Sequence, residues 1–322
     1  MKILGKRAVF AVLCLWLLSF PVEAARELVP VGQVIGLELR SGTVTVAGFD
    51  PQLGEAAKKA GLQEGDCIEK VNGKAVRCAE DVRAAVMAAH QPLELTVSRG
   101  GKRLSVTVRS SATEQGPKLG IYLRQGITGI GTVTWYDPET GSFGALGHGV
   151  NRPDGKLLQM TRGYAYTAKV AAVRKGISGQ PGQLVGQVED RSPLGELLCN
   201  TGRGVFGKTE AGWQGKALPI GEGSQIRTGE ATILSTVKDS TVREYSVEIL
   251  KIYPKANQTG RNLLLKVTDP ALLEATGGIV QGMSGSPIIQ DGKLIGAVTH
   301  VLVNDPTTGY GIFIENMLDA AA

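Results

Sequence analysis

The chain has 322 residues, of which 42% are apolar and 20% are charged, and its net charge is +5. This length allows two domains with a sizeable core, and the 44 glycines with only 5% aromatic residues favour short strands joined by tight turns. Acidic and basic residues are balanced and form no basic block, so the charge gives no argument for nucleic acid as a partner.

Residues 1–24 have the pattern of an export signal. A basic start is followed by an apolar run from Ala8 to Phe20 and a break at Pro21. Val22-Glu23-Ala24 then matches an A-x-A-like site with cleavage after Ala24. The apolar run is shorter than the about 20 residues that span a membrane, although an uncleaved segment would serve as a signal anchor. We therefore expect the rest of the chain to be exported.

Three cysteines remain after this leader, namely Cys67, Cys78 and Cys199. Three cysteines cannot form a disulfide framework, and no C-x-x-C pair indicates a zinc site. We expect buried or half-buried thiols, with a Cys67–Cys78 bridge as the alternative in an oxidising compartment. No metal or other cofactor is expected.

Residues 28–109 mix strand and helix patterns. The stretches 44–49 and 93–108 predict strands, the second a hairpin that turns at Gly100-Gly101. In residues 78–90, Val82, Ala85, Val86 and Ala89 follow helical spacing, which predicts an amphipathic helix.

The segment between them, AGLQEGDCIEKVNG, resembles the PDZ domain. PDZ domains bind an extended peptide as an added strand beside a sheet edge. By this resemblance the upstream stretch GQVIGLEL (Gly32–Leu39) is expected to be the ligand-binding loop and edge strand. The candidate groove residues are Ile35, Gly36, Leu37 and Leu39, faced by Val82 and Val86 of the helix. The alternative is that these side chains only pack the core.

A polar linker is predicted over 110–118 because SSATEQGPK contains Gly and Pro among polar residues. From 119 to 322 the chain shows short β-rich segments separated by Gly, Asn, Asp and Pro, without long amphipathic helical runs. This pattern predicts a β-barrel or sandwich domain.

The stretch GMSGSP near the C-terminus resembles the nucleophile turn G-x-S-G-G-P of chymotrypsin-like proteases. Glycines let the chain turn so that backbone N–H groups converge before a serine hydroxyl, which needs a base and oxyanion donors. By this match Ser284 is the nucleophile, and the amides of Gly282 and Ser284 form the oxyanion hole. Ser286 is the weaker candidate, and a glycine hairpin with a surface serine is the alternative.

The chain offers three histidines as a base. His148 lies in the glycine-flanked turn FGALGHGV, early in the second domain, where a chymotrypsin-like barrel places its base. His90 falls at the end of the predicted PDZ helix, and His300 follows the serine loop on a strand expected to wall the substrate pocket. His148 is therefore the predicted base, and His300 a structural or substrate-contacting residue.

A carboxylate should orient the imidazole. Asp269 follows an apolar strand and precedes Pro270, and it is the candidate that we favour. Asp291 belongs to a DG turn, and Asp239 and Asp190 lie in polar turns.

With leader, PDZ block and the motifs ALGHGV, VTDP and GGIVQGMSGSPIIQDGKLIGAVTH, the chain resembles the stage IV sporulation protein B peptidase family. The resemblance implies a mostly β chain with a PDZ domain and a chymotrypsin-like double β-barrel, and the triad His148, Asp269 and Ser284. It also implies an exported serine endopeptidase that acts between forespore and mother cell. Such a peptidase processes itself and cleaves a membrane-bound regulator of an intramembrane protease, which leads to sigma-factor activation. The alternative is a non-enzymatic PDZ adaptor with a degenerate protease domain.

The residue before Ser284 departs from digestive proteases, because Met283 stands where those enzymes have an aspartate. A freed N-terminal ammonium would find no charged partner there, and an unpaired buried charge is unfavourable by several kcal/mol. We expect Met283 to point inward and the loop to be ordered by its own packing.

Overall fold

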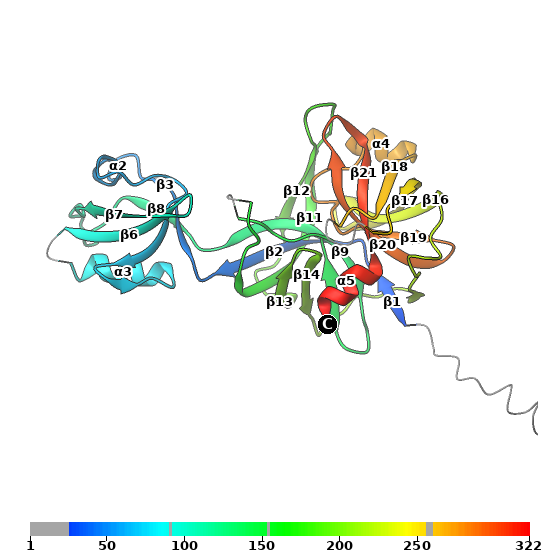
Figure 1. Ribbon diagram of the computed structural model, residues 1–322, viewed down its shortest axis with the longest axis horizontal. Coiled ribbons are helices and arrows are strands. Elements are labelled where there is room, and N and C mark those ends of the chain that lie inside the picture. Colours follow the sequence, from blue (N-terminus) through cyan, green and yellow to red (C-terminus); the bar gives the residue numbers. More distant parts are fainter. Residues whose placement is uncertain (1–25, 90–91, 153–154, 256–259) are drawn as a thin grey trace, which may run out of the picture.

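The computed structural model describes residues 26–89, 92–152, 155–255 and 260–322. The predicted leader, its cleavage position after Ala24 and His90 lie outside these residues. In the described ranges, no helix has both the length and the apolar character needed to cross a membrane. The chain is mostly β, with two six-stranded barrels packed together and a PDZ domain standing apart from them (Figure 1).

The first barrel closes because β10 pairs with both β9 and β14. Its six strands, in order around the barrel, are β9 (Ile127–Tyr136), β10 (Ser142–Ala145), β14 (Gly204–Lys208), β13 (Gly195–Thr201), β11 (Met160–Arg174) and β2 (Val34–Ser41). Three further strands extend this sheet, namely β1 (Glu27–Pro30) beside β9, β15 (Leu218–Pro219) beside β1, and β12 (Gln183–Val188) beside β11.

The second barrel is a closed ring around an aliphatic core. Its strands are β16 (Gly229–Lys238), β17 (Thr241–Ile252), β18 (Leu263–Val267), β21 (Asp305–Phe313), β20 (Lys293–Leu302) and β19 (Pro287–Gln290). Helix α4 (Pro270–Thr276) follows β18, and α5 (Ile314–Ala321) ends the chain. The alternating burial along β17 and β18 explains the short β-rich pattern of the sequence, since one face of each strand fills the barrel.

The PDZ domain contains the hairpin and the helix that the sequence predicts. Its elements are β3 (Val44–Phe49), α2 (Glu55–Lys59), β4 (Cys67–Val71), β5 (Lys74–Ala75), α3 (Ala79–Met87), β6 (Leu93–Arg99), β7 (Lys102–Val108) and β8 (Ile121–Arg124). Helix α3 begins after Cys78, where Asp81 accepts from the backbone amide of Cys78, so a reciprocal cap forms without a standard capping residue. All three described cysteines are free.

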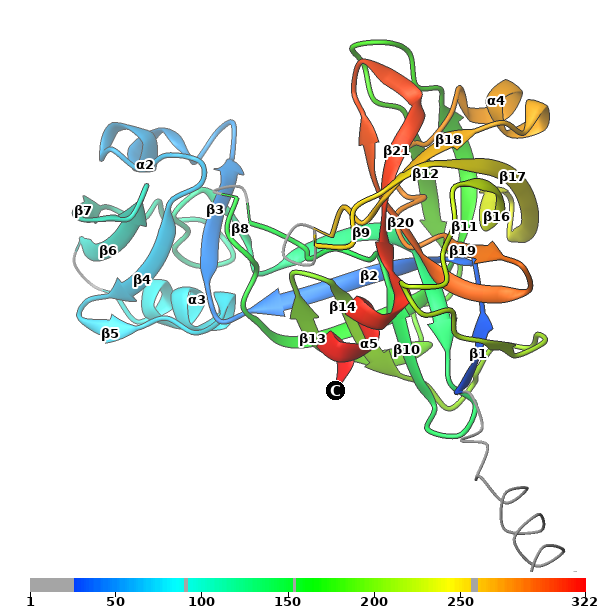
Figure 2. The same cartoon turned by 45° about the vertical axis from the view of Figure 1, so that its right-hand side comes forward.

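The N-terminal boundary of the PDZ domain differs from the predicted residue 28. Strands β1 and β2 belong to the first barrel, where β2 pairs with β11 on one side and with β9 on the other. Figure 2 shows β2 leaving the barrel and leading into β3 of the PDZ domain. The PDZ domain is therefore inserted at the end of the β2–β9 hairpin of the first barrel, not placed before it.

The C-terminal boundary also differs, because the predicted linker 110–118 does not end the PDZ domain. Ser111 pairs with Lys118 across a short loop, and β8 then joins the PDZ sheet beside β3. The sheet order is β7-β6-β4-β3-β8, which makes β8 an edge strand. Residues 110–118 form a turn inside the PDZ domain. A polar stretch with Gly and Pro is equally compatible with a turn and with a linker between domains.

Candidate active site

A cleft of about 560 Å³ holds the predicted nucleophile and base. Its walls come from strands of both barrels and from the serine loop, so the site lies between the barrels. The described lining includes Ser284, His148, His300, Gly282 and Thr299. The sequence prediction that the Ser284 and His148 segments meet in space is consistent with this arrangement.

The serine loop is fixed to both barrels by backbone hydrogen bonds. The amide of Thr132 on β9 donates to the carbonyl of Ser284 at 3.0 Å, and the amide of Gly285 donates to the carbonyl of Val298 on β20 at 2.7 Å. Gly285 has φ +98°, and a Cβ there would lie 2.0 Å from the carbonyl oxygen of Thr132. Only glycine fits this turn, which explains why the loop is glycine-rich.

The two predicted oxyanion donors are free of backbone partners within the described part of the chain. The carbonyl of Gln281 accepts from Leu184 at 2.8 Å and the carbonyl of Met283 accepts from Ser286 at 2.9 Å. In a trans peptide the N–H points opposite to the C=O, so the amides of Gly282 and Ser284 point away from these contacts. Two unpaired amides on either side of Met283, at a serine, are what an oxyanion hole requires.

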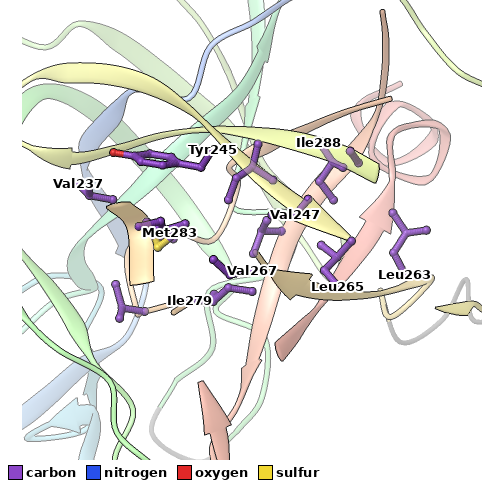
Figure 3. Close-up of a cluster of buried hydrophobic side chains, with 14 of the residues drawn as sticks. Val237, Tyr245, Val247, Leu263, Leu265, Val267, Ile279, Met283 and Ile288 are labelled. Carbon is purple, nitrogen blue, oxygen red and sulfur yellow. The ribbon is translucent and has the colours of Figure 1, made fainter. Parts of the chain in front are cut away.

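Met283 orders this loop from within, as predicted. It is 0% exposed and packs in the core of the second barrel. Figure 3 shows Met283 among apolar side chains that include Ile279, Val267 and Tyr245. A strand-like contact adds to this anchor, because the amide of Gln281 donates to the carbonyl of Gly182 at 2.9 Å. No charged side chain takes part in this anchor within the described chain.

His148 sits on a strained turn after β10. Leu146 and Gly147 have φ +71° and +68°, and a left-handed conformation is unusual for a residue as bulky as leucine. Gly147 packs so closely against barrel two that a Cβ would lie 2.9 Å from Cγ2 of Thr299. The turn therefore presents His148 of the first barrel directly to β20 of the second.

The tautomer of His148 follows from its one hydrogen bond. Nδ1 lies 2.9 Å from the carbonyl oxygen of Gly149, and a carbonyl can only accept, so Nδ1 carries the proton. Nε2 is then left with its lone pair. Burial lowers the pKa of His148 below the ordinary 6.5, and the hydrogen bond to Gly149 opposes that effect in part. The imidazole is thus neutral at neutral pH, the state that a general base needs.

The serine hydroxyl is engaged elsewhere in this structure. Oγ of Ser284 donates to the carbonyl of Thr299 at 2.7 Å. The proton transfer to His148 therefore requires a rotation of the Ser284 side chain. Hydrogen bonds between catalytic groups often form only when substrate is bound.

The structure does not join the predicted carboxylate Asp269 to the imidazole. Its side chain caps α4, with Oδ1 accepting from the amide of Leu272 at 3.0 Å and Oδ2 from the amide of Ser246 at 3.4 Å. In the described chain no carboxylate makes a hydrogen bond or ion pair with His148, whose Nδ1 is held by Gly149. An aspartate followed by a proline commonly forms the N-cap and first residue of a helix, and Asp269 has this capping role at α4.

We expect the role of Asp269 to be structural. Asp269→Ala should lower the free energy of unfolding by about 1 kcal/mol, because the α4 cap is lost. Asp269→Ser keeps a capping oxygen, so it should retain both the melting temperature and kcat. Urea unfolding and ester hydrolysis measure the two effects. A fall of kcat in folded Asp269→Ser to the level of a His148 variant would show that the carboxylate takes part in catalysis.

The predicted peptide groove at Gly32–Leu39 is wrong, because these residues lie within β2 or at its start and β2 has strand partners on both sides. No open edge remains there for an added peptide. Ile35 and Gly36 pair with Thr167 and Tyr166 of β11, whereas Leu37 and Leu39 line the catalytic cleft. On the helix side, Val82 and Val86 are 2% and 5% exposed and belong to the PDZ core, which was the alternative reading.

The PDZ sheet has β7 at one edge and β8 at the other. The sequence interpretation missed β8, the edge beside β3 and helix α3. Val46 exchanges hydrogen bonds with Gly65 and Asp66 on its other side, so its partner Leu123 turns its N–H and C=O to the open edge. Helix α3 flanks this edge at both ends: the amide of Ala79 donates to Gln125, and Met87 lies against Gly116. The signal in the sequence was the apolar alternation of KLGIYLR after the supposed linker.

Comparison with known proteins places both domains. The description "SpoIVB peptidase S55" matches residues 115–318, and the PDZ domain matches residues 51–99. A protein of Agrobacterium fabrum named as a zinc metalloprotease is 35% identical over 89 residues. A protein of Rhizobium meliloti named as a DegP-like periplasmic serine endoprotease is 31% identical over 97 residues.

These matches cover 27% and 28% of this chain, and only 22% and 19% of the two relatives. Among solved structures, the Rv3671c protease of M. tuberculosis in its active form is 12% identical, with a TM-score of 0.34, over 61% of this chain and 73% of that one. Its inactive form gives a TM-score of 0.35 at 12% identity, over 60% and 82% of the two chains. The family match spans most of the chain, and the protein belongs to the SpoIVB peptidase family S55, a family of serine peptidases.

Proposed function

We propose that the chain is an exported endopeptidase in which Ser284 is the nucleophile and His148 the base. The observation that supports this most directly is the meeting of Ser284, two unpaired amides and a neutral imidazole in one cleft. Nε2 of His148 takes the proton as Oγ attacks the scissile carbonyl, and the amides of Gly282 and Ser284 receive the oxyanion. His148 then protonates the leaving amine, and water hydrolyses the acyl-enzyme in a second cycle of the same steps.

The lining of the cleft favours uncharged substrate segments. No Asp, Glu, Lys or Arg side chain belongs to the described lining. Its larger side chains are apolar, including Leu37, Ile130, Val150, Ile279 and Val301. A charged side chain entering this cleft would lose its hydration without gaining a partner, which is unfavourable. We therefore propose that the substrate has apolar or small residues next to the scissile bond.

The biological role that we propose is signalling in spore formation. Family membership and the leader-like residues 1–24 support an enzyme that is exported into the space between forespore and mother cell. There it would process its own N-terminal region and cleave a membrane-bound regulator of an intramembrane protease, which leads to sigma-factor activation. The N-terminal segment would serve as a membrane anchor until it is cleaved.

N-terminal sequencing tests export and self-processing together. The wild-type chain and Ser284→Ala are expressed in a spore-forming host, and the N-termini of the mature proteins are compared. We expect a signal-peptidase terminus in both and additional shorter forms only in the wild type. Identical termini in the two proteins would rule out self-processing, and a wild-type serine unreactive to a fluorophosphonate would favour the non-enzymatic adaptor.

We also propose that the PDZ domain binds an extended peptide at β8, between this edge and α3. A family that joins a PDZ domain to a peptidase has protein substrates and peptide ligands, and PDZ domains add a peptide strand to an exposed edge. The outward backbone groups of Leu123 are the ones such a strand would meet.

Leu123→Pro should weaken peptide binding by at least about tenfold, since it removes the outward N–H that a ligand strand would use. Leu123→Ala keeps this N–H and is the matched control for the lost side chain. The probe is a fluorescein-labelled decapeptide selected from a random C-terminal phage library on the wild-type chain, and binding is measured by anisotropy. Equal affinities of the two variants would place the ligand elsewhere.

A further inference from the structure

A second imidazole lies against the base. His300 on β20 has its ring centroid 5.2 Å from that of His148, with the two planes inclined by 39°. Both rings line the cleft that holds Ser284. The mechanism above uses only His148, so the second ring requires its own explanation.

A β-bulge directs His300 into this position. The register between β20 and β21 shifts between Val298 and His300, so Thr299 is the extra residue. The Thr299 side chain is 2% exposed and donates to the carbonyls of Tyr310 and Gly260, while its own carbonyl accepts from Ser284. Bulges redirect side chains next to active sites. With Thr299 held inward, His300 is turned to the cleft.

The burial of His300 is not explained by a hydrogen bond from its Nδ1 to the rest of the described chain. Nδ1 is buried and has no hydrogen-bond partner among the described residues. A buried polar atom without a partner destabilises the fold, so its presence requires an explanation such as a catalytic role. This atom belongs to a ring in contact with the imidazole that must become positively charged in the reaction.

The charged and titratable groups around His300 all disfavour its protonation. They are His148 from the turn after β10 and Arg261 ahead of β18. The ring of Tyr310 on β21, which pairs with His300, has its centroid 5.1 Å from the Arg261 guanidinium. Burial first, and then the electrostatic influence of His148 and of the Arg261 guanidinium, lower the pKa of His300 to about 4. His300 is therefore neutral where His148 works, and it cannot repel the transient imidazolium.

We infer that His300 is a positioning residue for the base. Its ring packs against the His148 ring while the Gly149 carbonyl accepts from Nδ1, so that Nε2 is left free to take the proton. Its neutral, polarisable ring also gives the imidazolium a polar neighbour in a site where no described carboxylate reaches it. This inference rests on the proposed roles of Ser284 and His148.

The first test is kinetic, with His300→Ala, His300→Gln and His300→Phe on a p-nitrophenyl ester. We expect kcat of His300→Ala to fall by about 30-fold or more with KM within about threefold, and added imidazole to restore part of the rate. His300→Phe keeps ring packing without a polar atom and should lie between the alanine variant and the wild type. His300→Gln replaces the alanine variant in this test if the melting temperature of His300→Ala is too low for the assay. An unchanged kcat, or a raised KM with unchanged kcat as for a substrate contact, would overturn the inference.

The second test does not require peptidase activity, so it separates this inference from the proposed function. In the Ser284→Ala background, ¹⁵N NMR reports the tautomer and the titration of His148. With His300 present we expect one Nδ1–H tautomer and a pKa below 6.5. With His300→Ala we expect a mixture of tautomers and a pKa closer to 6.5, since burial and orientation are both reduced. An unchanged His148 spectrum would refute the positioning role, even if the peptidase assignment is correct.

Discussion

Ser284→Ala and His148→Ala are each expected to lower kcat by roughly 10⁴- to 10⁶-fold, and the double variant should be hardly worse than either. The reason is that nucleophile and base act in one step: without His148 nothing takes the proton of Ser284, and without Ser284 the base has no nucleophile to activate. The measurement is hydrolysis of an activated ester and labelling of Ser284 by a fluorophosphonate.

Folding should survive these changes. The Ser284 hydroxyl makes one hydrogen bond, to Thr299 at 2.7 Å, and its loss is worth about 1 kcal/mol. Ser286→Ala is the matched control, because this neighbouring serine is fully buried and bonds to Ser235. It should keep the rate. If Ser286→Ala lost activity while Ser284→Ala kept it, the nucleophile assignment would be wrong.

A chain that begins at Leu119 is expected to be unfolded, although it contains every residue of the region first predicted as the peptidase domain. It lacks β2, which lies between β9 and β11 and whose Val34, Ile35, Leu37 and Leu39 are at most 4% exposed. Burying four such side chains stabilises a fold by about 6–12 kcal/mol, which is comparable to the whole stability of a domain. Circular dichroism and thermal melting measure the result.

The converse deletion is the control. Residues 41–125 are replaced by Asn-Gly, which joins the ends of β2 and β9 as a tight hairpin. This variant loses the PDZ domain but keeps both barrels and the cleft, so it should fold and hydrolyse a small ester at a rate close to that of the wild type. A folded, active chain from Leu119, or a collapsed Asn-Gly variant, would contradict the inserted-domain topology. The same deletion should abolish binding of the PDZ peptide.

The features that the sequence alone determined are local ones. The serine turn needs glycine at Gly285 because a carbonyl lies where a Cβ would be, and this requirement is visible as a motif. The apolar Met283 predicted an inward side chain, and it is fully buried. The PDZ domain was likewise predictable, because its AGL, GD and VNG turns are each formed by consecutive residues. Such signals are readable because turn and helix conformations depend on neighbours in the chain.

The tertiary structure alone decided which distant segments share a strand pairing or a contact. An apolar alternating stretch such as VIGLEL fits a PDZ edge and a barrel interior equally well, and only its pairing with β9 and β11 assigns it to the barrel. Asp269 has the pattern of a triad carboxylate and of a helix cap, and the position of α4 makes it a cap. His300 lies beside His148 because of a β-bulge at Thr299, which no local sequence motif predicts. Side chains with two possible roles are resolved by packing, since the free energy of burial belongs to the assembled core and not to the segment.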